Sequence, residues 1–484
     1  MLRRSIAACL AAALTGVLVT AASPEASATE RRRPALNWGQ CPDDIPSAPV
    51  DPVVRCASLR LPVDWSEPHG ASFDLAVAHR QARRSDQRVG TLVFGPGGPG
   101  DSGVVRVRKA DRFSNELLDR FDIVSFDPRG VARSGAPRCA PDPGVPKPSM
   151  LLTSQADFEA TVAYNRALWG TCRLTSPVFD HADTLSTVYD LDALRQVLGE
   201  RRLTFHGSSY GTLLGQQYAE RFPGRVRAIV LEGVFDHSLD VPAFVRTQAQ
   251  TLQDSFDEFV TWCDDTTDCT LHGTDVRATW ADVLARADRG EYAPTTAFEV
   301  AALPLVKLSG PNWAGLAEEI RKLRDGGRPD VTVPPMASAV FCADWPVPVR
   351  DYQEYAGLVR LAATTAPDVR YGAGLFAVQA CLGWPTPVHN PPHRLHHVTG
   401  GGTPLLLLNA VHDPRTGYDW ATNVATQLGK RGRLVTYEGW GHGSYLRTGC
   451  TIAAVDRYLI DLVLPPPGAR CAAAKAVPVG GILA

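Results

Sequence analysis

Three residues that could together activate a hydroxyl group for nucleophilic attack follow one another along the chain as Ser209, Asp413 and His442. A histidine can take the proton from a serine hydroxyl group. A carboxylate can hold that histidine in the required tautomer and stabilise its protonated form. This combination is typical of enzymes that form a covalent intermediate on serine. The sequence must therefore supply elements that bring these three side chains together.

The serine lies in a five-residue pattern that favours an exposed hydroxyl group. Gly207-Ser-Ser-Tyr-Gly211 matches Gly-X-Ser-X-Gly, with Ser209 at the apex. We predict a buried strand before it and a helix beginning near Thr212. A serine on such a sharp turn has a strained backbone, and glycines two residues to either side permit the close packing. The pattern alone also fits an ordinary strand-to-helix turn, so its significance depends on the rest of the chain.

A glycine-rich segment, Gly95-Pro-Gly-Gly-Pro-Gly100, follows another expected strand. Glycines let the backbone approach a ligand closely and leave N–H groups free to bind it. We predict an oxyanion hole made by the N–H groups of Gly98 and Tyr210, because Pro96 and Pro99 have no N–H group. A plain tight loop is the alternative. A phosphate-binding loop is disfavoured, because no Gly-Lys-Ser/Thr ending is present.

Asp413 and His442 are each expected on a loop that directly follows a strand. The ends of parallel strands meet at one edge of a sheet, so both side chains should lie near Ser209 there. The chain order serine, acid, histidine is that of an α/β-hydrolase. His412 is a poorer candidate for the base, because it would precede the acid in the chain. Asp419 is a fallback acid, but it lies in a segment that indicates a helix.

Strands and helices alternate over most of the chain, which predicts a mostly parallel α/β sheet of the α/β-hydrolase type. The segments before residue 81 indicate an antiparallel start to this sheet. Between residues 236 and 396 helical patterns dominate, so we predict an inserted, largely helical cap. The predicted divisions are a signal peptide at 1–28, the first part of the core at 29–235, the cap at 236–396, and the second part of the core with its tail at 397–484.

The N-terminal segment predicts export. Arg3 and Arg4 precede the apolar run 6–20, and Ala26-Ser-Ala28 forms a small-residue cleavage site. A retained anchor is the less favoured alternative, because no long apolar run follows. We expect a secreted protein with no membrane contact after the signal is removed. The net charge of −2 gives no indication of a nucleic-acid partner.

The number of cysteines also indicates an exported protein. Of the 11 cysteines, Cys9 lies in the signal peptide, and an even number remains in the exported chain, which predicts disulfides. A metal site is disfavoured, because no Cys-X-X-Cys pair occurs. The sequence does not determine the connectivity. We predict pairing of successive cysteines, because short loops close easily. The candidates are Cys41, Cys56, Cys139, Cys172, Cys263, Cys269, Cys342, Cys381, Cys450 and Cys471.

Most of the mature chain resembles the exported tripeptidyl aminopeptidases, a group of the α/β-hydrolase family related to proline iminopeptidases. The resemblance implies a peptidase that releases short N-terminal peptides and needs no metal or cofactor. One departure stands out, because Glu232-Gly233 replaces a frequent Asp-Gly. Pro96 stands where proline iminopeptidases carry a histidine, which places the chain nearer the tripeptidyl group. The matching motifs are Leu61-Pro-Val-Asp-Trp65, Gly95-Pro-Gly-Gly-Pro-Gly100, Asp127-Pro-Arg-Gly130, Gly207-Ser-Ser-Tyr-Gly211, Cys342-Ala-Asp-Trp345, Asp413, Gly441-His-Gly443 and the tail from Cys450 to Cys471.

Such an enzyme would have to pair the charged α-amino group of its peptide substrate with a carboxylate. For a tripeptide this anchor should lie roughly 10 Å from Ser209, because an extended chain advances about 3.3 Å per residue. Glu232 is the first candidate, followed by Asp236 and Asp344, and each could instead be an ordinary surface or capping acid. A secreted carboxylesterase with the same triad, and a non-catalytic binding protein on this fold, remain the alternatives. The sequence does not indicate an oligomeric state.

Overall fold

The computed structural model describes residues 36–42, 51–140, 145–332, 336–395 and 403–475. The predicted signal peptide and the predicted boundary at 396/397 lie outside these ranges. The residues from Leu36 onward form one compact unit. Within the described ranges, the helices are all too short or too polar to cross a membrane.

Ten strands in the described ranges form one sheet in the order β1-β2-β3-β5-β4-β6-β7-β8-β9-β10. The first three strands and the β3–β5 pair are antiparallel, and all later pairs are parallel. The predicted mostly parallel sheet with an antiparallel start is confirmed. The strands are β1 (Gly39–Gln40), β2 (Val54–Pro62), β3 (Ser72–Arg80), β4 (Gly90–Gly95), β5 (Phe121–Phe126), β6 (Leu203–Ser208), β7 (Val226–Glu232), β8 (Leu405–His412), β9 (Gly432–Trp440) and β10 (Arg470–Cys471).

Helices cover both faces of this sheet, which explains why its central strands are continuous apolar runs. Side chains alternate between the faces along a strand. In β8, Leu405 and Leu407 join one apolar cluster, and Leu406 and Leu408 join the other. The first cluster includes residues of α4 (Thr184–Val197), α5 (Gly211–Arg221) and α14 (Tyr418–Leu428), and the second includes residues of α1 (Gly103–Lys109), α2 (Asn115–Arg120) and α15 (Gly449–Asp461).

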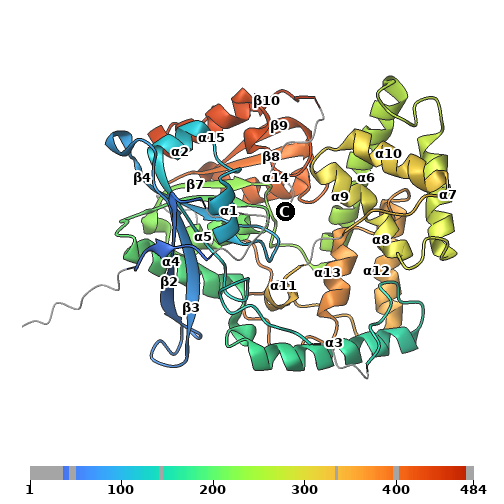
Figure 1. Cartoon of the computed structure of the whole chain (residues 1–484), viewed down its shortest axis with the longest axis horizontal. Coiled ribbons are helices and arrows are strands. Elements are labelled where there is room, and N and C mark those ends of the chain that lie inside the picture. Colours follow the sequence, from blue (N-terminus) through green and yellow to red (C-terminus); the bar gives the residue numbers. More distant parts are fainter. Residues whose placement is uncertain (1–35, 43–50, 141–144, 333–335, 396–402, 476–484) are drawn as a thin grey trace, which may run out of the picture. The chain divides into compact units, whose positions relative to one another are not determined.

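Between β7 and β8 the described residues form helices and no strand, and we call α6 to α13 the cap helices. They lie beside the sheet, and α3 (Gln155–Thr175) runs along the ends of α12 and α13 (Figure 1). Helix α3 thus shares the largest apolar cluster with the cap helices, although it precedes Ser209 in the chain. The cap helices are α6 (Val241–Asp265), α7 (Val276–Asp288), α8 (Ala297–Ala301), α9 (Leu303–Ser309), α10 (Trp313–Arg324), α11 (Ser338–Asp344), α12 (Tyr352–Thr365) and α13 (Ala373–Cys381).

The predicted disulfides are confirmed, including the pairing of successive cysteines: Cys41–Cys56, Cys139–Cys172, Cys263–Cys269, Cys342–Cys381 and Cys450–Cys471.

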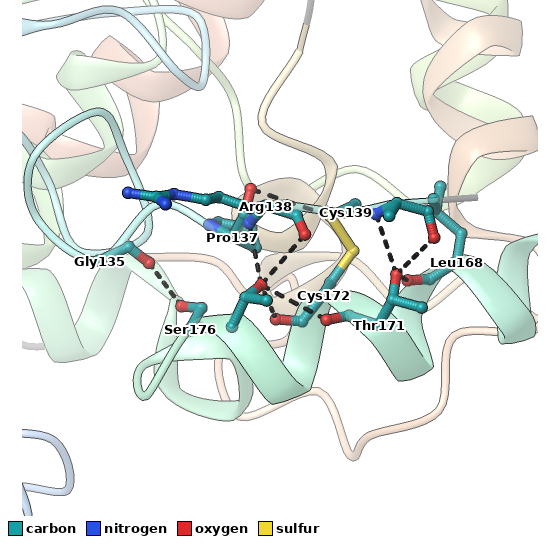
Figure 2. The surroundings of a disulfide bond; sticks show 10 residues. Gly135, Pro137, Arg138, Cys139, Leu168, Thr171, Cys172 and Ser176 are labelled. Carbon is teal, nitrogen blue, oxygen red and sulfur yellow. Dashed lines mark hydrogen bonds between the residues drawn. A yellow bond between two sulfur atoms is a disulfide. The ribbon is translucent and has the colours of Figure 1, made fainter. Parts of the chain in front are cut away.

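One of these disulfides, Cys139–Cys172, fastens the loop after β5 to helix α3 (Figure 2). The hydroxyl group of Thr171 in α3 accepts a hydrogen bond from the N–H group of Ala140 at 3.2 Å and lies 3.0 Å from its carbonyl oxygen. One turn later, Ser176 donates to the carbonyl oxygen of Gly135 at 2.5 Å. The loop is therefore held by covalent and polar contacts to the last part of α3 and to Ser176, the residue that follows it.

Candidate active site

Ser209 occupies the sharp turn between β6 and α5. Its φ angle is +57°, a left-handed conformation that is uncommon for residues other than glycine. A Cβ atom on Gly207 would lie 2.5 Å from the carbonyl oxygen of Gly211, and one on Gly211 would lie 2.3 Å from that of Gly95. Both positions therefore require glycine. This is the strained turn that the pattern around Ser209 predicts, and it leaves Ser209 partly exposed.

Asp413 and His442 are in contact at the ends of β8 and β9. The Nδ1 atom of His442 lies 2.9 Å from Oδ2 and 3.0 Å from Oδ1 of the buried Asp413. Oδ1 of Asp413 also accepts hydrogen bonds from the backbone N–H groups of Arg415 at 2.9 Å and Thr416 at 3.0 Å. An ionised Asp413 requires the proton of His442 on Nδ1, which leaves Nε2 free to accept a proton.

A third residue in this contact, Thr416, was missed by sequence reasoning. Its hydroxyl group donates to Oδ2 of Asp413 at 3.0 Å and lies 3.3 Å from Nδ1 of His442. The sequence contained one signal for this contact, a threonine three positions after Asp413. Asp and Thr side chains commonly form hydrogen bonds with groups that are near in the sequence. Thr416 therefore helps to fix the carboxylate that orients His442.

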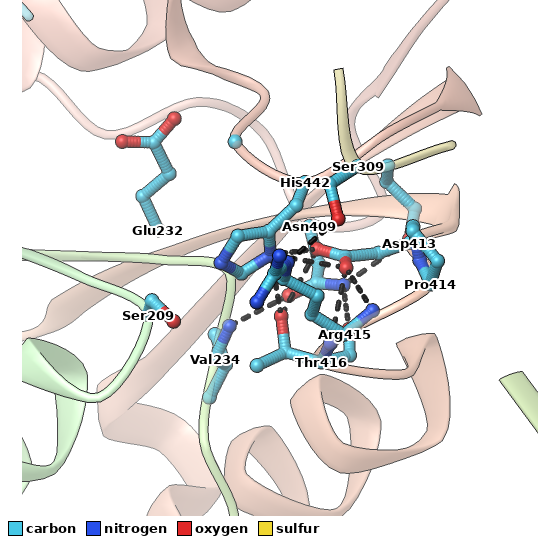
Figure 3. Close-up of polar contacts among 12 residues, drawn as sticks. Ser209, Glu232, Val234, Ser309, Asn409, Asp413, Pro414, Arg415, Thr416 and His442 are labelled. Carbon is cyan, nitrogen blue, oxygen red and sulfur yellow. Dashed lines mark hydrogen bonds and ion pairs between the residues drawn. The ribbon is translucent and has the colours of Figure 1, made fainter. Parts of the chain in front are cut away.

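The imidazole ring of His442 lies between Ser209 on one side and the Asp413 carboxylate on the other (Figure 3). The dipeptide Glu232-Gly233 connects them. The N–H group of Ser209 donates to the carbonyl oxygen of Glu232 at 2.8 Å, and a Cβ atom on Gly233 would lie 3.1 Å from Cε1 of His442. The end of β7 thus brings the predicted nucleophile, base and acid into one site.

The predicted oxyanion hole lies against Ser209. A Cβ atom on Gly97 would lie 2.9 Å from Cβ and 3.5 Å from Oγ of Ser209, so the glycine-rich loop must be free of side chains here. Gly98 has a φ angle of +106°. In the part of the chain that the structure describes, the N–H groups of Gly98 and Tyr210 donate to no protein acceptor. Both are available to a ligand, as the prediction requires.

Asp344, a predicted amine anchor, instead binds Tyr210, the residue after Ser209. It is fully buried and accepts hydrogen bonds from the Tyr210 hydroxyl group at 2.5 Å, from N–H and Oγ1 of Thr184 at 2.8 and 2.5 Å, and from Nδ2 of Asn390 at 2.7 Å. Burial, together with the charge of Asp183, raises the pKa of Asp344 to about 7. The prediction is therefore corrected: four donors already fill this carboxyl group.

Glu232, the first-choice anchor, is also occupied, and its side chain points away from Ser209 (Figure 3). Its Oε2 lies 3.0 Å from Nε2 of His206, and its Oε1 accepts a hydrogen bond from the N–H group of Tyr445 at 2.8 Å. Burial alone would raise the pKa of Glu232, but His206, Arg112 and the Tyr445 N–H group outweigh burial and lower the pKa to about 2. Glu232 therefore supports the loop that carries His442 and does not present a free carboxylate.

Asp236 is likewise a structural acid. Its Oδ1 accepts hydrogen bonds from the N–H group of Ser238 at 2.9 Å and from its hydroxyl group at 2.7 Å. Its Oδ2 accepts one from Nδ2 of Asn423 at 2.5 Å. Asp236 is almost fully buried, so these bonds stabilise the segment between the sheet and the cap helices. The prediction of an amine anchor at Asp236 is therefore also corrected.

The cap helices reach the catalytic loops through Ser309 at the end of α9. Its carbonyl oxygen accepts a hydrogen bond from the N–H group of His442 at 2.8 Å, and its hydroxyl group accepts one from Nε of Arg415 at 2.6 Å. The neighbouring His412 is turned to Asp254, with Nδ1 and Oδ2 2.8 Å apart. His442 therefore remains the better candidate for the base. Within the described ranges, the structure contains no group of three His, Cys, Asp or Glu side chains that could hold a metal ion.

Comparison with known proteins agrees with this geometry. Residues 90–447 match the family described as alpha/beta hydrolase fold. The serine protease Hip1 of Mycobacterium tuberculosis is 30% identical over 90% of this chain and 91% of its own. Carboxylesterase B of the same species is 30% identical over 95% and 96%. The tripeptidyl aminopeptidase of Streptomyces lividans is 29% identical over 90% and 86%.

Proposed function

The chain belongs to the α/β-hydrolase family and is a serine hydrolase, and on that premise we propose that it is a secreted exopeptidase that releases short N-terminal peptides, tripeptides in particular. The observation that carries the proposal is the His442–Asp413 pair beside the strained Ser209. The similarity to a tripeptidyl aminopeptidase supports a peptide substrate. The five disulfides support an extracellular location.

The geometry supports the following mechanism. Nε2 of His442 takes the proton from Oγ of Ser209 as Oγ attacks the peptide carbonyl carbon. The N–H groups of Gly98 and Tyr210 hold the negative charge that develops on the carbonyl oxygen. His442 then gives the proton to the departing amine, and the carbon–nitrogen bond breaks. Water, activated by His442 in the same way, hydrolyses the ester on Ser209 and releases the short peptide.

A carboxylesterase is the second candidate, and one observation favours it. The three carboxyl groups considered as amine anchors, those of Glu232, Asp236 and Asp344, are all occupied by donors of the protein. A buried ammonium group without a carboxylate would be strongly unfavourable. An exopeptidase would therefore have to bind the α-amino group through another carboxylate or at the solvent-exposed mouth of the site.

The deciding experiment compares tripeptidyl p-nitroanilides that have free and acetylated N-termini with a p-nitrophenyl ester. An exopeptidase should strongly prefer the free amine, whereas an esterase should cleave only the ester. Equal cleavage of both anilides would exclude the exopeptidase. Ser209→Ala should abolish every activity, and Ser208→Ala, at the buried end of β6, is the matched control. A fluorophosphonate probe that labels a residue other than Ser209 would contradict the mechanism.

A further inference from the structure

A cavity of about 510 Å³ opens beside the glycine-rich loop. Gly100 forms part of its wall, and so does Ala337, which precedes α11. The two segments are in contact, because the N–H group of Ala337 donates to the carbonyl oxygen of Pro99 at 2.8 Å. The cavity therefore begins at the loop that supplies one of the predicted oxyanion donors.

The cavity and His442 lie on opposite sides of Ser209 along the sheet. Strands β4 and β5 lie to one side of the nucleophile strand β6, and β7, β8 and β9 lie to the other. The described residues that line the cavity come from the loops after β4 and β5, from α3 and the turn that follows it, from α11 and the segment before it, and from α13. None comes from the loops that carry Asp413 and His442. The departing group must face His442, which protonates it, so the acyl side of the substrate faces the cavity.

The walls suit an uncharged apolar group. Trp169, Phe179, Phe376, Met150 and Met336 all line the cavity. A volume of this size is typical of pockets that bury a small organic ligand. Burial of apolar surface among such side chains is favourable at about 25 cal/mol per Å².

Charged groups would gain little in this cavity. No aspartate or glutamate is among the described residues that line it, and its one charged residue, Lys147, is exposed. The buried amides in the wall are already used: Nδ2 of Asn165 donates to the carbonyl oxygens of Gln379 and Leu382 at 3.0 Å, and Nε2 of Gln379 donates to that of Ser149 at 2.8 Å. A charged group placed among the buried walls would lose its hydration without gaining a buried charged partner.

Disulfides also join the elements that line the cavity. Cys139 and Cys172 both line it, and their disulfide joins the loop after β5 to α3 (Figure 2). Cys342–Cys381 joins α11 to α13 on the opposite side. Two disulfides thus fix the elements between which the cavity lies, so a ligand meets a preformed site and loses less free energy in ordering it.

We propose that this cavity is the subsite for an uncharged, apolar group on the acyl side of the scissile bond. In a peptide the group is the side chain of the residue that precedes the bond, and in an ester it is the hydrocarbon chain of the acid. The inference rests on the proposed function only in requiring that Ser209 forms an acyl-enzyme.

The test fills the cavity from α13. Ala380→Trp places a large ring into it, and Ala281→Trp, on the exposed face of α7 and away from the cavity, is the matched control. Substrates are p-nitrophenyl acetate, butyrate and hexanoate, and free-amine tripeptidyl p-nitroanilides ending in alanine, leucine or glutamate. In the wild type, kcat/KM should rise about fourfold per added methylene group while the chain still fits. Leucine should exceed alanine, and glutamate should be the poorest.

With Ala380→Trp the preference for hexanoate over acetate should fall by about tenfold or more. Phe376→Ala, which enlarges the cavity, should shift the preference to longer chains and provides an independent answer if Ala380→Trp does not fold. The inference is overturned if both variants keep the wild-type chain-length profile, or if glutamate is preferred to leucine. Because the ester series does not depend on peptide cleavage, it can succeed where the exopeptidase proposal fails.

Discussion

Asp344→Ala tests whether the cap helices hold the nucleophile turn. The substitution removes the acceptor of four buried hydrogen bonds, which come from Tyr210, Thr184 and Asn390. At roughly 1 kcal/mol for each donor left unpaired, the low end of the usual cost, the free energy of unfolding should fall by about 4 kcal/mol. Because Tyr210 follows Ser209 and its N–H group is a predicted oxyanion donor, kcat should also fall, by about tenfold or more.

The loss should depend on pH. The pKa of Asp344 is raised by burial from 3.8 to about 7 in the folded protein, so its contribution to stability is complete below 3.8 and disappears as the pH rises through about 7. Asp344→Ala should therefore destabilise more at about pH 5 than at about pH 8. Urea unfolding followed by tryptophan fluorescence at both pH values measures this.

Tyr210→Phe is the control, because it removes one of the four donors and should cost only about 1 kcal/mol. A wild-type unfolding midpoint for Asp344→Ala at both pH values would refute the hydrogen-bond argument. A large loss of stability with an unchanged kcat on a p-nitrophenyl ester would show that Asp344 does not position the nucleophile turn.

Four further results are expected. Ser209→Ala should lower kcat on the order of 10⁶-fold in steady-state assays. The pH profile of kcat/KM should fall on the acid side, because a protonated His442 cannot accept the serine proton. The pKa of Glu232 is lowered from 4.5 to about 2 in the folded protein. Its contribution to stability is therefore complete above 4.5 and is lost as the pH falls through about 2. Glu232→Gln should thus destabilise the protein more at neutral than at acid pH in thermal unfolding. Replacing Cys139 and Cys172 together by serine should cost about 2–4 kcal/mol in denaturant unfolding, and the denatured, unreduced wild type should show no free thiol in a reagent titration.

The features that sequence could predict are local ones. The parallel strands are apolar runs with helical patterns between them, and the nucleophile turn is marked by Gly207 and Gly211, where a side chain cannot fit. The disulfides follow from short sequence separations, such as the separation of 6 positions from Cys263 to Cys269. Each of these signals lies within one segment of chain.

The features that sequence missed depend on residues far apart in the chain. Asp344 meets Thr184 across 160 positions and Tyr210 across 134, and no local pattern indicates such pairs. Glu232 has the carboxylate that an amine anchor needs, but this carboxylate is already bound by the Tyr445 N–H group and by His206. The packing of α3 against the cap helices was missed for the same reason. An amphipathic pattern shows that one face of a helix is buried, but it does not show which element covers that face.

The contact between Ser309 and His442 bears on how the enzyme could be engineered. Exchanging the cap of one hydrolase for that of another is attractive as a route to new specificity, since the cap helices all lie between β7 and β8 in the chain. Here, however, the carbonyl oxygen of Ser309 in α9 accepts a hydrogen bond from the backbone N–H group of His442, the proposed base. A graft that replaced α9 without an equivalent acceptor would leave the His442 N–H group unpaired, so a transplanted cap would have to bring its own support for the histidine.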